Sequence, residues 1–319
     1  MIAVLGEAVV DLVGQGDRLY RAHPGGSPLN VAVGLGRLER PTALLARLSR
    51  DAFGAMFRRH LAASGVSDAL LVEADEPSTL AVATVDATGV ATYDFWVQGT
   101  ADWQWTAAEL DRLNGANALA LHTGSMALEI DPGAAAILDL LRRCRGRLAV
   151  SYDPNVRMAR RGPVADGRAR VESVVALADL VKVSADDLDW LYPGEDPAGV
   201  AARWTAAGPG LVVATLGPAG ALARTGAGVE ARRPAVAVDV VDTVGAGDAF
   251  MSGLLDGLAE RDLLGPDSRP RLAAIDEPAL DALLDRASLV AALTCARAGA
   301  DPPTRAELDA VTAGGPAGG

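Results

Sequence analysis

Lysine, cysteine, histidine and long apolar runs are all scarce in this chain of 319 residues. The 2 cysteines, Cys144 and Cys295, are too few for a disulfide scaffold or for a zinc site built on cysteine. The 3 histidines show no metal-ligand spacing. No run of about 18 apolar residues occurs, and the N-terminus lacks the pattern of a secretion signal. These absences predict a reduced, cytoplasmic protein without a membrane span.

Positive charge is also limited, because 29 basic residues face 41 acidic ones and the net charge is −12. A wide nucleic-acid footprint needs lysine and arginine on one face, so we expect no nucleic-acid partner. A local basic pocket for a phosphorylated ligand remains compatible with this balance. The hydrophobic fraction of 50% excludes general disorder and allows a sizeable core.

Short apolar runs alternate with longer stretches of helical periodicity. Such alternation predicts an α/β fold with a mainly parallel sheet covered by helices on both faces. The predicted strands are Ile2–Gly6, Thr42–Leu48, Ala118–His122, Leu148–Asp153, Leu180–Val183 and Leu211–Leu216. The predicted helices are Ser27–Leu38, Ala52–Ser64, Ala107–Leu113, Gly133–Arg143, Val164–Ala176 and Ala198–Ala206.

One region breaks this alternation. Thr79–Val85 and Val90–Val97 are strand-like and flank the turn Asp86–Gly89, which predicts a β-hairpin without a crossover helix. Two interpretations stay open. The hairpin is either an ordinary sheet edge or, together with the segment Ala8–Tyr20, a small lid that excludes water from a pocket.

Three familiar site motifs are absent. A phosphate loop of the type GxxxxGK[ST] needs a Gly-Lys pair, whereas the only lysine, Lys182, follows Val181. The dinucleotide pattern GxGxxG does not follow the first strand, and no Gly-x-Ser-x-Gly elbow is present. A nucleotide would therefore have to be bound by another kind of motif.

The strongest motif is the segment Val241–Phe250, which contains Gly245, Ala246, Gly247 and Asp248. The three small residues precede a helical stretch, so several backbone N–H groups can converge at a helix N-terminus and form an anion hole. Asp248 then has two interpretations. It either takes a proton from an attacking hydroxyl or only stabilises the start of the helix.

A second motif lies in the segment His23–Ala32. Ser27 is predicted to cap a helix whose first residue is Pro28. Gly25 and Gly26 allow a ligand to approach the backbone, and Asn30 offers a polyol both a donor and an acceptor. A plain glycine turn before a helix is the alternative. Asp11, just past the first strand, adds another acceptor.

These two motifs resemble the two signatures of the PfkB (ribokinase-like) carbohydrate kinases, and the similarity extends over nearly the whole chain. The Asp-Pro-Asn-x-Arg segment and the Cys-x-Arg-x-Gly-Ala segment resemble the fructokinase branch. Further matching segments are Gly6-Glu7 with Asp11, Asp51 with Phe53-Gly54, Thr100–Asp102, Asp153–Arg157, Val181–Ser184, Thr215–Gly220 and Cys295–Pro302.

The resemblance implies a Rossmann-like, ribokinase-like α/β fold with a small β-lid. The chain would form one kinase domain over residues 1–312, with lid segments at about 8–22 and 77–103 inserted and a flexible tail at 313–319. The family implies ATP and Mg²⁺, and a K⁺ ion in many members. Lid strands in relatives sometimes pair across a homodimer.

The resemblance also implies a role for each matching residue. Asp248 would be the catalytic base, and Gly245, Ala246 and Gly247 would supply the anion hole. The substrate-binding set would be Asp11, Gly25, Gly26, Asn30, Gln98, Asn155 and Arg157. The ATP-binding set would be Lys182, Ser184, Thr215, Gly217, Gly220 and Ser288. Asp187 would help to hold Mg²⁺, and the backbone of Asp242 and Val244 would contact a monovalent cation.

Several positions depart from the family pattern. Val244 replaces a threonine, and Ser184 and Asp187 stand where asparagine and glutamate are usual, which puts the Mg²⁺ geometry in question. Gln98 stands on the lid where related kinases often have arginine. A neutral glutamine favours a neutral sugar over 2-keto-3-deoxygluconate, whose carboxylate suits an arginine. Trp96, Trp103 and Trp105 are candidates for stacking on the sugar, and packing under the lid is the alternative for two of them.

The sequence therefore predicts an ATP-dependent kinase that phosphorylates a primary hydroxyl of a neutral sugar, with a fructokinase first. The alternatives within the family are a 2-keto-3-deoxygluconate kinase, a ribokinase and a nucleoside kinase. The alternative of another class is a non-catalytic sugar- or nucleotide-binding protein, in which Asp248 only stabilises a helix.

Overall fold

The computed structural model describes residues 1–15, 18–85 and 91–313 of the chain. Within these residues, an 8-stranded sheet runs in the order β14-β13-β12-β11-β10-β9-β1-β4. Its strands are β1 (Ile2–Leu5), β4 (Thr42–Leu45), β9 (Ala120–Gly124), β10 (Ala149–Asp153), β11 (Leu180–Ser184), β12 (Leu211–Thr215), β13 (Ala221–Thr225) and β14 (Glu230–Arg233). The pairs from β4 to β12 are parallel, and only β13 and β14 add antiparallel pairs.

Two apolar cores fill the space between this sheet and the helices, as expected for a parallel sheet buried on both faces. One core lies under α1 (Ser27–Arg37), α2 (Ala52–Ala63), α8 (Ala246–Glu260), α9 (Ser268–Ala273) and α10 (Glu277–Cys295). The other lies under α3 (Ala107–Leu110), α4 (Gly133–Cys144), α5 (Val164–Val175), α6 (Ala185–Leu191) and α7 (Pro197–Ala207). The predicted α/β class with helices on both faces is confirmed.

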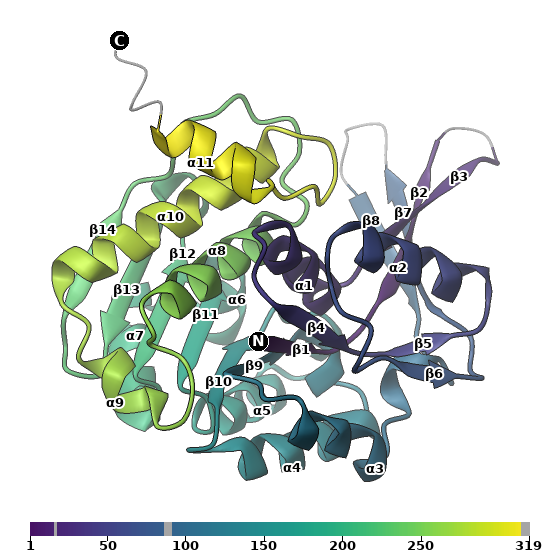
Figure 1. Ribbon diagram of the computed structural model, residues 1–319, viewed down its shortest axis with the longest axis horizontal. Coiled ribbons are helices and arrows are strands. Elements are labelled where there is room, and N and C mark those ends of the chain that lie inside the picture. Colours follow the sequence, from purple (N-terminus) through teal and green to yellow (C-terminus); the bar gives the residue numbers. More distant parts are fainter. Residues whose placement is uncertain (16–17, 86–90, 314–319) are drawn as a thin grey trace.

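The hairpin predicted at residues 79–97 belongs to a second, 4-stranded sheet of order β3-β2-β7-β8. Its strands are β2 (Val9–Gly14), β3 (Tyr20–Gly25), β7 (Thr79–Val85) and β8 (Ala91–Trp96). Figure 1 shows this lid sheet projecting to one side of the main sheet, beside α2. The predicted turn Asp86–Gly89 lies outside the described residues, as does the predicted tail except for Ala313, the last residue of α11 (Arg305–Ala313).

Two features of the chain differ from the sequence prediction. The apolar run Thr42–Leu48 is not one strand but two, because the chain leaves the main sheet after Leu45. Its second part, β5 (Arg47–Ser49), pairs instead with β6 (Val72–Ala74). The prediction also missed the long helix α10, although Asp276 caps its start with a hydrogen bond from the Ala279 N–H at 2.9 Å. No helix in the described ranges is long and apolar enough to cross a membrane.

A buried carboxylate anchors the lid where its chain segments leave the core. Asp102, which follows β8, accepts hydrogen bonds from the Ala8 N–H at 2.8 Å and the Thr79 hydroxyl at 2.6 Å. Ala8 and Thr79 lie at the starts of the lid strands β2 and β7. Arg47 reinforces this anchor, because it donates to the Ala101 carbonyl at 3.0 Å and pairs with Glu76 at 2.8 Å. The acidic side chain of Asp102 and the basic side chain of Arg47 therefore both fix the base of the lid to the core.

Replacing Asp102 by alanine should destabilise the protein, because the buried Ala8 N–H would lose its acceptor and the Thr79 hydroxyl would keep only its contact with the Thr100 hydroxyl. We expect the free energy of unfolding to fall by about 1–3 kcal/mol in urea titrations. Asp94→Ala is the matched control, since Asp94 lies on the lid strand β8 but is exposed. Equal stability of the Asp102→Ala and Asp94→Ala variants would contradict the anchoring role of Asp102.

Candidate active site

The glycine-rich loop opens α8 as the sequence predicts. Gly245 is the N-cap residue and has a left-handed φ of 76°, which favours glycine at this position. The Ala246 N–H donates to the Thr243 carbonyl at 3.2 Å. Within the described residues, the N–H groups of Gly245, Gly247 and Asp248 have no hydrogen-bond acceptor in the protein. Three backbone donors therefore remain available at the positive end of a 15-residue helix.

Asp248 points away from the backbone of its own helix and toward the start of α1. Its Oδ1 accepts a hydrogen bond from the Ser27 hydroxyl at 2.6 Å, and its Oδ2 accepts one from Asn30 Nδ2 at 2.9 Å. No side chain caps α8. Burial raises the pKa of Asp248, while the bonds from Ser27 and Asn30 act in the opposite direction. This orientation does not fit an aspartate that only caps a helix.

Ser27 does not occupy the N-cap position that the sequence predicts. The N-cap of α1 is Gly26, so Ser27 is the first helical residue and Pro28 the second. The Ser27 side chain is therefore not used as a cap and is free to reach Asp248 in another helix, 221 positions along the chain. Sequence reasoning missed this contact because the N-cap position accounted for the serine locally.

Asp11 lies on the lid strand β2 and faces the same site. Its pKa is raised to about 6, first by burial and then by the negative charge of Asp248. The Asp11 carboxylate packs against Gly25, where a Cβ atom would lie 2.1 Å from Asp11 Oδ2. The predicted substrate residues Asp11, Gly25, Gly26 and Asn30 thus lie around Asp248.

The strand register decides which lid side chains share the face of Asp11. Asp11 pairs with Ala81, which pairs with Phe95, so Phe95 and Tyr93 lie on this face. Burial and the nearby charges of Asp11 and Asp242 raise the pKa of Tyr93. Tyr93 was not predicted, because alternation along a strand does not show which face covers the pocket.

Two predicted lid contacts receive no support from this register. Trp96 follows Phe95 on the opposite face and is 54% exposed, whereas Trp103 and Trp105 are buried, so the geometry gives the stacking of these tryptophans on a sugar no support. Gln98 is exposed beyond the end of β8. Its contact with the substrate stays a prediction.

Asn155 and Arg157 follow β10, where the carboxyl ends of the parallel strands meet. Asn155 has a φ of 38° and its side chain lies 3.5 Å from the Ser125 hydroxyl. Arg157 is exposed, and Glu129 accepts a hydrogen bond from its backbone N–H at 3.1 Å. The positive charge of Arg157 is close enough to lower the pKa of Asp248. The predicted position of Arg157 beside the reacting groups is consistent with this geometry.

The residues predicted to contact ATP line the next two strand ends and α10. Thr215 is the last residue of β12, Gly217 and Gly220 form the turn to β13, and Ser288 is buried in α10. Gly220 has a φ of 92°, and a Cβ atom at this position would lie 2.0 Å from the Arg233 carbonyl oxygen. The turn itself therefore requires glycine here, whether or not ATP binds. The nucleotide contacts of all four residues stay predictions.

Ser184 and Asp187 have a structural role at the start of α6. The Ser184 hydroxyl accepts a hydrogen bond from the Asp187 N–H at 3.1 Å and donates to Asp187 Oδ2 at 2.8 Å. Asp187 Oδ1 accepts from the Val156 N–H and from Arg160, both at 3.1 Å. Protein donors therefore occupy both oxygens of Asp187, and the geometry gives its predicted contact with Mg²⁺ no support. Among the described residues, no group of three or more metal-ligating side chains is present.

Asp242 joins the loop before α8 to the segment that follows α10. Its carboxylate accepts hydrogen bonds from the Val244 N–H at 3.0 Å and from the Gly299 N–H at 2.8 Å. In the described part of the chain, the backbone carbonyls of Asp242 and Val244 accept no hydrogen bond. Both oxygens predicted to contact a monovalent cation are therefore unpaired.

Lys182 lies below the glycine loop rather than at the surface. Its ammonium donates to Asp153 Oδ2 at 2.6 Å, and the exposed fractions of the two side chains are 4% and 1%. Burial raises the pKa of Asp153 to about 6, against the opposing effect of Lys182. The pair therefore lies inside the protein, next to the predicted anion hole.

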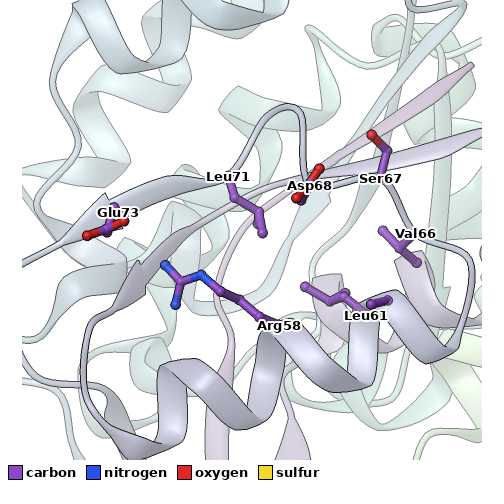
Figure 2. Close-up of a pocket in the computed structure, with 8 residues that line it drawn as sticks. Arg58, Leu61, Val66, Ser67, Asp68, Leu71 and Glu73 are labelled. Atoms are coloured by element: carbon purple, nitrogen blue, oxygen red, sulfur yellow. The ribbon is translucent and has the colours of Figure 1, made fainter.

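A cavity of about 370 Å³ elsewhere in the molecule contains none of the predicted site residues. It lies between α2 and the segment 66–73. In Figure 2, Arg58 and Leu61 approach it from the helix, opposite Leu71 and Glu73. Arg58 is used inside the protein, since it donates to the Ser49 carbonyl at 3.0 Å. The candidate active site is therefore the region around Asp248.

Comparison with known proteins identifies the family of the chain. Residues 1–307 match the family model described as pfkB family carbohydrate kinase. The chain belongs to this family. Its predicted family and its predicted class of activity, an ATP-dependent sugar kinase, are therefore confirmed.

Individual members of the family are similar over most of their length. A fructokinase of Rhizobium leguminosarum bv. trifolii is 36% identical over 284 residues, which cover 88% of this chain and 85% of that protein. The structure of a Xylella fastidiosa fructokinase with bound ATP aligns with a TM-score of 0.87 at 26% identity, covering 98% of both chains. A Vibrio cholerae O395 fructokinase double mutant in a form with bound fructose, ADP and potassium ion aligns with a TM-score of 0.79 at 27% identity, covering 97% of both chains.

The contact between Ser27 and Asp248 generates a prediction for this carbohydrate kinase. Ser27→Ala removes a hydrogen bond that stabilises the ionised carboxylate, so the pKa of Asp248 should rise further. Since the ionised form accepts the proton, the acid limb of the kcat profile should move to higher pH, by about one pH unit. Ser173→Ala, on the exposed side of α5, is the control. An unchanged profile in Ser27→Ala would contradict the coupling.

Proposed function

We propose that the protein is a fructokinase that transfers the γ-phosphoryl group of ATP to a primary hydroxyl of fructose. The observation that carries this proposal is the orientation of Asp248, whose carboxylate lies beside three unpaired backbone donors and is held by Ser27 and Asn30. A base next to an anion hole is the arrangement that phosphoryl transfer to an alcohol requires. The fructokinases among its relatives support fructose as the sugar.

The reaction uses groups that are already in place. The sugar lies between the lid and α1, where Asp11 and Asn30 bind its hydroxyls. Its primary hydroxyl donates a proton to Asp248 as the oxygen attacks the γ-phosphorus, while the bond from that phosphorus to the β,γ-bridging oxygen breaks and ADP leaves. The free N–H groups of Gly245, Gly247 and Asp248 donate to the phosphoryl oxygens and stabilise the charge that develops there. The lid residues Tyr93 and Phe95 cover this region and limit the access of water.

The charges of the site favour a neutral sugar. Asp11 and Asp248 are close enough for the charge of Asp248 to raise the pKa of Asp11. The carboxylate of an acid sugar would add a third negative charge to this pair. Hydroxyl groups instead donate hydrogen bonds to both carboxylates. The proposal therefore ranks a neutral ketose above 2-keto-3-deoxygluconate.

The chain offers different donors to the two proposed metal ions. Asp187 is engaged by protein donors, so the phosphates of ATP and water would supply most Mg²⁺ ligands, as is usual for this ion. When bound, Mg²⁺ would supply positive charge that neutralises the phosphates of ATP. The unpaired carbonyls of Asp242 and Val244 fit a K⁺ ion, and a homodimer through the lid edges β3 and β8 stays a prediction.

Asp248→Asn should separate catalysis from binding. The asparagine keeps the size of the side chain but cannot accept the proton, so kcat should fall by about 100- to 10,000-fold. ADP affinity and the free energy of unfolding should change little. A coupled assay of ADP release and a urea titration measure these quantities. Near-normal turnover would remove Asp248 as the base and would leave a non-catalytic binding role for this side chain.

A panel of acceptors identifies the sugar. We expect the highest kcat/KM with D-fructose in an ADP-release assay, and values at least tenfold lower with ribose, 2-keto-3-deoxygluconate and adenosine. Phosphorus NMR of the product identifies the hydroxyl that is phosphorylated. A higher kcat/KM for any other acceptor would overturn the assignment of fructose, while leaving the kinase activity itself intact.

A further inference from the structure

The starting observation is the turn that follows β10 and carries two of the predicted substrate residues. Its middle residue, Val156, is fully buried, and the Val156 N–H donates to Asp187 Oδ1 at 3.1 Å. The next two N–H groups, those of Arg157 and Met158, both donate to the carboxylate of Glu129, the first at 3.1 Å. Two carboxylates from different segments therefore receive three successive backbone donors of one turn.

The turn needs support because part of its backbone is unfavourable. Asn155 has a φ of 38°, in the left-handed region that is uncommon for residues other than glycine. Backbone of this kind persists where the surrounding structure fixes it, and it is concentrated at functional sites. The Val156 carbonyl is fixed as well, since it accepts hydrogen bonds from Arg160 Nε and from the Arg157 guanidinium, both at 3.0 Å. The turn is therefore held on both its donor and its acceptor side.

Glu129 is itself fixed to the rest of the molecule. It follows the short 3₁₀ helix Ser125–Leu128 after β9, and its backbone carbonyl accepts a hydrogen bond from Arg170 in α5 at 2.8 Å. Ile130 and Met158, which adjoin the contact on its two sides, pack against one apolar cluster that includes residues of the lid strands β2 and β7. Glu129 therefore ties the turn to a support formed by α5 and the base of the lid.

The turn places the charge of Arg157 near the reacting groups. Burial raises the pKa of Asp248 on α8 and of Tyr93 on β8, and the positive charge of Arg157 opposes both increases. The guanidinium is therefore within electrostatic reach of both the predicted base and the lid. The Arg157 side chain is exposed, so its direction depends on where the turn fixes its backbone.

Satisfying the backbone does not by itself explain a carboxylate at position 129. The contact with the Arg157 N–H lies at the surface, where water can accept the same hydrogen bond. Hydrogen bonds to an ionised carboxylate are shorter and stronger than neutral ones, and two of them to successive N–H groups also fix a direction. Glu129 is therefore better explained by a need to hold the turn in one orientation.

We propose that Glu129 is a positioning residue that holds the backbone of Arg157, so that the guanidinium meets the substrate beside Asp248. This inference rests on the proposed phosphotransfer and on the substrate contact that the family resemblance implies for Arg157. Glu129 bonds the backbone of the turn and acts on the reaction through Arg157. The kinetic effect of losing Glu129 should therefore disappear once the guanidinium is absent.

A double-mutant cycle on the full chain tests this dependence. Glu129→Ala, Arg157→Met and the double variant are compared with the wild type by ADP release, with the acceptor that the wild type uses best. Each single variant should lower kcat/KM for the sugar by about 10- to 100-fold, because small displacements of a positioned group slow the reaction. The double variant should stay within about threefold of Arg157→Met, since residues that act as one unit are not additive.

Two further variants separate positioning from a general loss of stability. Asp276→Ala is the matched control, because Asp276 also accepts a backbone N–H, that of Ala279 at 2.9 Å, but does so at the start of α10. This control should lose stability in a urea titration and keep kcat/KM within about twofold of the wild type. Glu129→Gln keeps one carbonyl acceptor for the turn, so its kcat/KM should exceed that of Glu129→Ala.

The opposite results overturn the inference. An unchanged kcat/KM in Glu129→Ala would show that the turn needs no carboxylate there, and a Glu129→Gln variant no better than Glu129→Ala would show that the acceptor oxygen is not what matters. Losses that multiply in the double variant would show that Glu129 acts independently of Arg157.

Failure of this inference is distinguishable from failure of the proposed function. An active wild type in which Arg157→Met changes nothing would overturn the inference alone and leave the kinase activity intact. A preferred sugar other than fructose would overturn that assignment alone, because the cycle uses whichever acceptor the wild type prefers. A wild-type protein that phosphorylates no acceptor in the panel would overturn both.

Discussion

The whole arrangement depends on one hydrogen-bonded contact between two helices that begin at the same point. α1 presents Ser27 and Asn30 at its first turn, and α8 presents Asp248 at its own, 218 positions after Asn30. Each helix N-terminus carries a partial positive charge, so the carboxylate between them is favourable for both. Sheet order, helix packing and the lid all bring these two turns together at the carboxyl ends of the parallel strands, where ligands bind in open α/β sheets.

Burial makes the carboxylate of Asp248 a better proton acceptor. A carboxylate in water has little tendency to take a proton from an alcohol, but desolvation raises the pKa of Asp248 while Ser27 and Asn30 keep its orientation. The same physics acts on Asp11 and Asp153, whose pKa values both rise to about 6. The site thus concentrates buried acidic groups near the N-terminus of α8.

Much of this site was accessible from the sequence, for a physical reason. Gly245 and Asp248 are local features of one loop, and the requirement for small residues before a helix is visible without tertiary structure. Ser27 could not be assigned, because its hydrogen bond depends on how two distant helices pack. Tyr93 was missed because the face of a strand is decided by its register. The end of β4 at Leu45 was also not visible in the sequence. Ala46 continues the apolar run, and Arg47 is buried in the structure although its side chain is charged.

The anchored base of the lid has a mechanical consequence. Asp102 and Arg47 fix the ends of the lid strands that adjoin the core. Any bending of the lid would therefore be confined to the part of the lid beyond these contacts. Side chains of the lid beyond these residues can therefore be replaced without disturbing the buried contacts that join the lid to the core.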